Sequence, residues 1–178
     1  MSSSTLSVPT NVKFDEAIDL AQAFLIQLKK NELTSSQIQD FVAALVQTAN
    51  GARGFFVTYL TAKDPICDEP QPEIIAALQA NPAVAADLLV KNIAMSTAQQ
   101  LYHQRRDDRE MAASSATVAA RTTKIIQQLQ LSQIQDMCRE LVSTIHTDDG
   151  VYTDFLTRWG YDDEQKNAIA QAISQLIA

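Results

Sequence analysis

The pentapeptide Ser36-Gln-Ile-Gln-Asp40 recurs unchanged as Ser132-Gln-Ile-Gln-Asp136, at an offset of 96 residues. At that offset 11 of the 26 positions in 36–61 are identical without a gap, and Gly54 aligns with Gly150. Two unrelated amphipathic helices share apolar spacing by chance, but they do not share a matched set of Ser, Gln, Asp and Gly. The sequence therefore predicts an internal repeat, in which one helical unit is used twice.

The repeated pentapeptide has the pattern of a helix start. Ser36 and Ser132 each precede an apolar run with a spacing of three and four, and Gln39 or Gln135 follows three residues later. This is the capping-box pattern, in which two side chains satisfy backbone amides that the first helical turn leaves without partners. We expect a helix to begin at each serine, with Cys138 as a small buried hydrophobic residue on the apolar face of the second.

After this helix, each copy is expected to contain a short turn at its glycine, then an aromatic helix and one further helix. The aromatic helix is expected to end near Asp64-Pro65 in the first copy and at Gly160 in the second. The further helix is expected to open at Pro72 in the first copy and among residues 162–164 in the second. Each copy is thus predicted as a chain of short helices.

Composition also favours helix over sheet. The 178 residues include 25 Ala and 18 Gln, and only 6% are aromatic. Ala and unbranched side chains lose little entropy in a helix, whereas strands prefer β-branched and aromatic residues. We predict an all-α, single-domain helical bundle with an extra central helix between the two repeats. Its expected divisions are a disordered tail (1–12) and one helical domain (13–178), made of repeat one (about 13–80), the central helix (about 82–104) and repeat two (about 109–178).

The polar segment 104–110 lies in a stretch that contains neither Gly nor Pro. It is either a tight polar joint between two helices or the exposed middle of one long helix. We favour the joint, with Asp107 or Asp108 as the next N-cap, because aspartate side chains accept hydrogen bonds from free amides at a helix start.

Charge and hydropathy exclude several classes of partner. The net charge is -7, whereas nucleic acids and anionic membranes both require a large cationic surface. No apolar run approaches the roughly 18 residues that are needed to span a bilayer. The first residues, Met1-Ser-Ser-Ser-Thr-Leu, do not have the pattern of a secretory signal. We expect a cytoplasmic protein with a protein partner, or one that associates with itself as a homo-oligomer.

Patterns typical of catalysis or of metal binding are missing from the sequence. Cys67 and Cys138 stand in no Cys-x-x-Cys spacing, and neither His103 nor His146 falls in a Glu-x-x-His pair. There is no His-Glu-x-x-His, no glycine-rich phosphate loop and no Gly-x-Ser-x-Gly. We therefore predict no metal and no cofactor, assign no catalytic residue, and favour a protein that is not an enzyme.

Basic residues gather in one place, and we take them as candidate contacts with a ligand or partner: His103, Arg105, Arg106 and Arg109. Arginine presents paired donors that suit phosphate or an acidic segment. The acidic residues interleaved with them favour the alternative of an internally neutralised joint. Arg53 is a further candidate: it either pairs with Asp149 or is solvated, in which case Asp148 caps the second aromatic helix.

The aromatic helices supply the last candidates, Tyr59, Tyr152 and Trp159. They either line an apolar pocket between the repeats or fill the core. We expect a non-catalytic protein–protein interaction module, and the alternative is a binder of a small apolar or tetrapyrrole-like ligand. An enclosed pocket lined by the aromatic helices would favour the ligand binder, whereas a filled core with an exposed apolar patch would favour the module.

Overall fold

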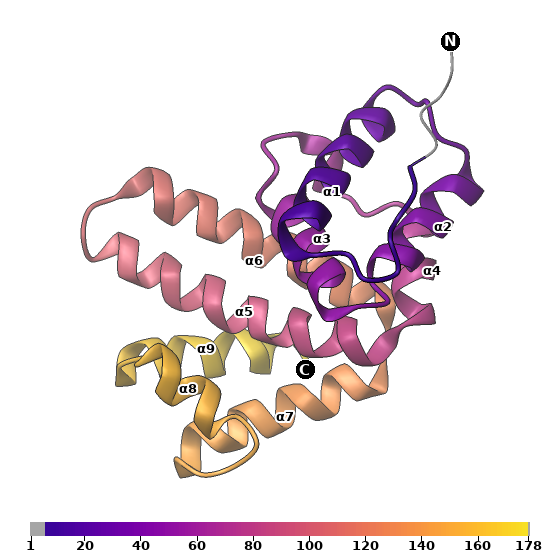
Figure 1. Ribbon diagram of the computed structural model, residues 1–178. Coiled ribbons are helices and arrows are strands. Elements are labelled where there is room, and N and C mark those ends of the chain that lie inside the picture. The colour runs from indigo at the N-terminus through magenta and orange to yellow at the C-terminus, as the bar shows by residue number, and fades with distance from the viewer. Residues whose placement is uncertain (1–5, 178) are drawn as a thin grey trace. The chain divides into compact units, whose positions relative to one another are not determined.

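The computed structural model describes residues 6–177 and contains no strand over that range, so the prediction of an all-α fold is confirmed (Figure 1). A short 3-10 turn, Pro65–Cys67, follows the third helix. In chain order the described α-helices are α1 (Phe14–Lys29), α2 (Ser35–Leu45), α3 (Ala49–Thr61), α4 (Pro72–Ala80), α5 (Pro82–Gln104), α6 (Arg109–Leu129), α7 (Ser132–Thr147), α8 (Thr153–Trp159) and α9 (Asp163–Leu176).

The chain divides into two compact units, one up to Leu88 and one from Leu89, so the boundary falls inside α5. The predicted repeat and its domain limits stay predictions. Of the tail that we expected to be disordered, residues 1–5 lie outside the described part of the chain. Val12, at the end of that tail, is only 3% exposed, and its amide donates to the carbonyl of Pro9.

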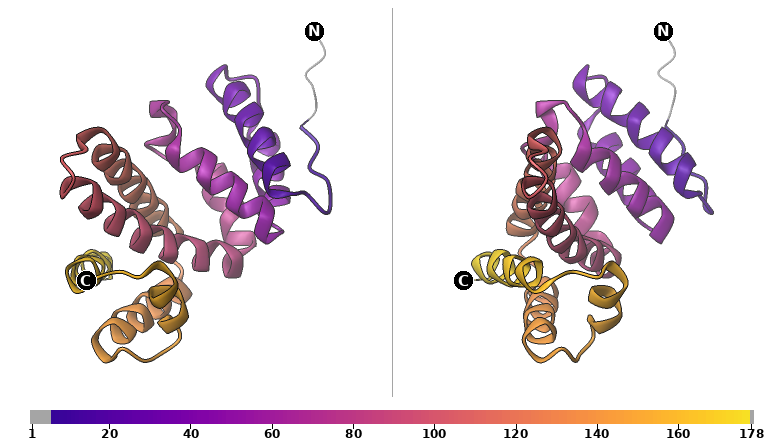
Figure 2. Two further views of the ribbon diagram at one scale, coloured as in Figure 1. Left: turned by 60° about the vertical axis from the view of Figure 1, so that its left-hand side comes forward. Right: turned by 90° about the vertical axis from the view of Figure 1, so that its left-hand side faces the viewer.

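In the first unit α1 packs beside α3, and α2 packs beside α4 (Figures 1 and 2). The core is built from aromatic rings. Phe24 of α1 stacks on Phe41 of α2, with ring centroids 4.8 Å apart. Phe55 contacts both Phe56 and Tyr59 within α3. These five side chains are each 5% exposed or less, so the aromatic helix of this unit lies in its core.

Gly54 does not lie in a turn, so that prediction is wrong. It lies inside α3, which begins earlier because the hydroxyl of Thr48 accepts a hydrogen bond from the amide of Gly51 and caps the helix. A Cβ at Gly54 would lie 2.4 Å from the Cβ of Ala17. The glycine is thus needed for the close approach of α1 to α3.

The predicted N-caps at Ser36 and Ser132 are also wrong. Thr34 caps α2: its hydroxyl accepts from the amide of Gln37, and the side chain of Gln37 accepts from the amide of Thr34. Two capping patterns overlap here, and the first of them starts the helix, so Ser35 is helical as well as Ser36. At the aligned position 96 residues later, α7 begins at Ser132 itself, and Leu131 occupies the N-cap position.

In the second unit α7 packs beside α9. Cys138 lies on the buried face of α7 as predicted, at 0% exposure, and burial raises the pKa of its thiol to about 11. The joint after α5 is confirmed, because Asp108 caps α6 by accepting from the amide of Met111. The start of α4 at Pro72 and the end of α8 at Gly160 also match the prediction.

Among the described residues, no single helix has both the length and the hydropathy that crossing a bilayer requires; only α4 and α5 taken together as a bent pair reach that level. Within the same residues, no three His, Cys, Asp or Glu side chains are grouped closely enough to hold a metal ion.

Candidate functional site

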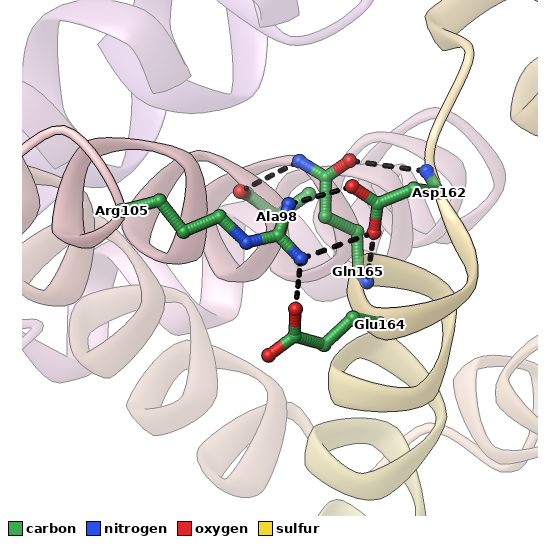
Figure 3. A network of polar contacts seen from close by, with 5 residues as sticks. All are labelled: Ala98, Arg105, Asp162, Glu164 and Gln165. Atoms are coloured by element: carbon green, nitrogen blue, oxygen red, sulfur yellow. Dashed lines mark hydrogen bonds and ion pairs between the residues drawn. The ribbon is translucent and has the colours of Figure 1, made fainter.

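Arg105, in the joint between α5 and α6, forms an ion-pair network with the start of α9 (Figure 3). Its Nη1 donates to Oδ2 of Asp162 at 2.6 Å, and its Nη2 donates to Oδ1 at 3.2 Å. Nη2 also donates to a carboxylate oxygen of Glu164. The planar guanidinium thus binds one carboxylate with two nitrogens, which is the arrangement that fixes geometry best.

The same network caps α9 (Figure 3). Asp162 Oδ1 accepts from the amide of Gln165 at 2.9 Å, and the side-chain oxygen of Gln165 accepts from the amide of Asp162 at 3.1 Å. Nε2 of Gln165 donates to the carbonyl of Ala98 in α5, also at 3.1 Å. Since Gln165 is 9% exposed, loss of its side chain would leave buried polar groups without partners. The network therefore links α5 to the start of α9 within the second unit.

The other predicted basic contacts also face acidic or aromatic groups. His103 Nδ1 lies 3.7 Å from Oδ2 of Asp108, and Nε of Arg109 lies 3.4 Å from Oδ1 of Asp107. The guanidinium carbon of Arg106 lies 4.4 Å from the ring centroid of Tyr102. The basic cluster thus contains its own acidic counter-charges, as the neutralised-joint interpretation requires.

Acid should weaken the second unit through Asp162. The hydrogen bond from Arg105, followed by the one from the Gln165 amide, lowers the pKa of Asp162 from 3.8 to about 2. A carboxyl group whose pKa is lowered by folding adds stability above its unfolded pKa, and this is lost as the pH falls through the folded pKa. We expect the urea midpoint of the second unit to fall between about pH 4 and pH 2, with less of a fall in Asp162→Asn.

The matched control for this acid titration is Asp163→Asn, which removes the same charge one residue later without touching Arg105. The urea midpoint is measured in pH steps by the fluorescence of Trp159, the one tryptophan in the sequence. Equal loss of stability in acid for Asp162→Asn and the unmodified chain would contradict the assignment. Asparagine keeps the capping function, so the comparison isolates the charge.

The remaining predicted contacts lie in different surroundings. Tyr59 and Tyr152 are 1% and 3% exposed and pack in the cores of their units, whereas Trp159 is 47% exposed at the end of α8. Asp148 does not cap α8, which begins after Tyr152. It ends α7 instead, with φ at 54°, and it pairs with Lys166. A residue that ends one helix in this conformation is not available to start the next.

The first unit has an apolar groove that no sequence pattern predicted. It lies along α1 and α3 and has a volume of about 490 Å³. Ile26 is 57% exposed and Val57 41% exposed, so the groove presents two large aliphatic side chains to solvent. Its lining includes Ile18, Gln22, Leu25 and Ile26 of α1, with Val57 and Thr61 of α3.

A cation–π contact stands at one end of this groove and an ion pair at the other. At the start of α1, the guanidinium of Arg53 lies 5.0 Å from the ring centroid of Phe14. At the other end, Nζ of Lys29 lies 2.5 Å from Oδ2 of Asp64. The start of α1 therefore lies near the first half of α3, and its end lies near the residues that follow α3. The two helices run parallel, with apolar surface between polar ends.

The sequence signal for this groove is present in α1, although it is easy to overlook. Ala17, Ala21, Phe24 and Leu28 form the buried stripe. Ile18 and Ile26 fall outside that stripe, so α1 carries more apolar surface than one buried face requires. This excess is the sequence feature that corresponds to the groove.

A model of the family described as "Uncharacterised conserved protein UCP020893" matches residues 13–176. No curated protein and no solved structure matches the chain.

Proposed function

The chain belongs to this family of uncharacterised conserved proteins, and we propose that it is a non-catalytic interaction module that binds a helix of a protein partner in the α1–α3 groove. The observation that carries the proposal is the exposed apolar groove itself, with Ile26 and Val57 open to solvent. Contiguous apolar surface with a polar rim is typical of protein contact sites. The exposed pair contributes apolar area that a bound helix would remove from water.

A helix suits this groove better than a compact ligand. The groove residues of α1 run from Ile18 to Ile26, which is about 12 Å at a rise of 1.5 Å per residue, or roughly two turns of a partner helix. Amphipathic helices bind grooves of this kind through side chains spaced by three and four residues. The charged groups at the two ends would contact the polar ends of such a helix. The groove therefore supports an elongated, amphipathic partner.

The arrangement of the aromatic residues favours the module over a binder of a small apolar or tetrapyrrole-like ligand. Tyr59 stacks on Phe55 with centroids 5.4 Å apart, and Tyr152 contacts Phe155 edge to face. These rings occupy core volume that an enclosed ligand would need. Filled cores together with an exposed apolar groove are the combination expected of an interaction module.

The internal repeat, the cytoplasmic location and the choice of a protein partner are part of the same proposal. The pairing of α2 with α4 in one unit and of α7 with α9 in the other supports a duplicated unit. Cys67 and Cys138 are both buried and neither forms a disulfide, which suits a reducing cytoplasm. The net charge of -7 supports a protein partner over nucleic acid or an anionic membrane.

Photo-crosslinking from the groove tests the proposed function. We expect p-benzoylphenylalanine at position 61 to form a covalent adduct in cells that express the protein natively, because Thr61 lines the groove and is exposed. The adduct is mapped by mass spectrometry to one helix of one protein. Partner binding buries the groove, so Val57→Asp should reduce the adduct at least about tenfold by placing a charge in an apolar contact.

The matched control is the same probe at Thr117, an exposed threonine of α6. Both hydroxyls donate to the carbonyl four residues earlier, Thr61 to Val57 and Thr117 to Ala113. Equal adducts from both positions, or none from position 61, would refute the proposed function.

A further inference from the structure

The exposed face of α1 carries a stripe of residues that is symmetric about Gln22. We call it the α1 stripe: Asp15, Ile18, Gln22, Ile26 and Lys29. Its spacings are three, four, four and three residues, so its side chains lie along one side of the helix. The charge is negative at the start, positive at the end, and absent in the middle. Three of these residues, Ile18, Gln22 and Ile26, also line the groove.

We propose that the helix bound in the groove is α1 of a second copy of this chain, laid antiparallel about a two-fold axis at Gln22. This inference rests on the proposed function and names its partner. A two-fold axis makes residues equally far from Gln22 face each other across the interface. Ile18 then faces Ile26 of the second copy, and Asp15 faces Lys29.

Charge selects this orientation. In the antiparallel arrangement, Asp15 of each copy lies opposite Lys29 of the other, so opposite charges meet at both ends. A parallel arrangement would place Asp15 against Asp15 and Lys29 against Lys29, and like charges across an interface are unfavourable. Lys29 already pairs with Asp64, but its ammonium group has three donors and accommodates a second carboxylate.

The apolar part of the stripe supplies the attraction. Ile26 is 57% exposed in the single chain, and the antiparallel arrangement places it over Ile18 and near Val57 of the second copy. Both copies contribute the same surface, so the contact closes on itself and leaves no apolar stripe open for further association. Two pairs of parallel helices packed in this way give a four-helix arrangement with an apolar centre.

Cysteine crosslinking of the full chain tests the axis. Gln22→Cys should form a disulfide-linked dimer on mild oxidation, because the two Gln22 residues face each other across the axis. Ile26→Cys should not, since the two residues would stand about 12 Å apart along the helices, beyond the roughly 7 Å limit between Cα atoms. The native cysteines are 1% and 0% exposed, so they do not compete.

Charge reversal provides a second measurement that does not depend on oxidation. By sedimentation, Asp15→Lys and Lys29→Asp should each weaken the dimer about tenfold, since each change replaces two attractions with two repulsions. All variants carry Asp64→Asn, so that position 29 has no carboxylate neighbour within its own chain. The double variant Asp15→Lys, Lys29→Asp should restore dimerisation, because the opposite charges meet again. Circular dichroism checks that each variant is folded.

Three outcomes would overturn the inference. The first is equally efficient crosslinking from Gln22→Cys and Ile26→Cys, which indicates a parallel or undefined contact. The second is a monomer at all concentrations, and the third is no restoration in the folded double variant. If one of these is found while the probe at position 61 still crosslinks to another protein, the self-pairing fails and the interaction module stands. If that probe gives no adduct either, both fail.

Discussion

Gly54→Val is expected to separate α1 from α3 and to lower the stability of the first unit by about 3 kcal/mol or more. A Cβ at this position would lie 2.4 Å from the Cβ of Ala17 and 3.0 Å from backbone atoms of Ala17 and Ile18. Backbone atoms inside a helix cannot give way as a flexible side chain does. Relief of the overlap therefore requires the whole of α1 to move, which opens the groove.

Gly54→Ala isolates the contact from the change in helix propensity. Alanine favours a helix interior over glycine by up to about 1 kcal/mol, yet we expect a net loss because the first added carbon already overlaps with Ala17. Ala17→Gly in the same chain removes that neighbouring Cβ and should restore part of the lost stability relative to Ala17→Gly alone, because backbone atoms of Ala17 and Ile18 still lie 3.0 Å from the added Cβ. The helix signal in circular dichroism, followed through a urea titration, measures these changes. An unchanged urea midpoint in Gly54→Val would show that the two helices do not depend on this contact.

Local sequence signals predicted several helix ends, because a cap or a break acts within a few residues. Asp108 caps α6, Pro72 opens α4, and Gly160 ends α8 with φ at 59°. The role of Gly54 was mispredicted because the alignment of the copies transferred a turn from Gly150. The hydroxyl of Thr48 starts a helix before Gly54 in the first copy, whereas in the second copy α7 continues to Thr147. Gly54 and Gly150, although aligned in sequence, thus occupy different backbone conformations.

The candidate site was only partly predictable, since its contacts depend on tertiary packing. Arg105 was identified from sequence because its charge is visible there. Its partners, Asp162 and Glu164, stand 57 and 59 residues away, and no local pattern connects them with it. The groove was not predicted because the exposure of Ile26 and Val57 depends on which face of each helix finds a neighbour. Apolar periodicity identifies the buried stripe and does not show which further apolar residues stay uncovered.

Gly150→Ala is expected to lower the stability of the second unit by about 1–3 kcal/mol, for a reason that differs from the one at Gly54. Gly150 has φ at 146°, a conformation that residues with a Cβ rarely adopt, and an added Cβ would lie 2.5 Å from Oγ1 of Thr144. Thr144 is 2% exposed and its hydroxyl donates to the carbonyl of Glu140 at 2.8 Å, so it has little freedom to move. Backbone strain and a steric overlap therefore act together.

A second-site change separates these two causes. Thr144→Ala in the Gly150→Ala chain removes the overlapping oxygen but leaves the backbone at positive φ, so we expect only partial recovery relative to Thr144→Ala alone. At Gly54 the backbone is helical and carries no such strain, so Ala17→Gly should recover a larger share of the loss than Thr144→Ala does. Urea titration followed by Trp159 fluorescence measures the second unit. Full recovery with Thr144→Ala would mean that the overlap alone requires glycine, and the two aligned glycines would then both serve close packing.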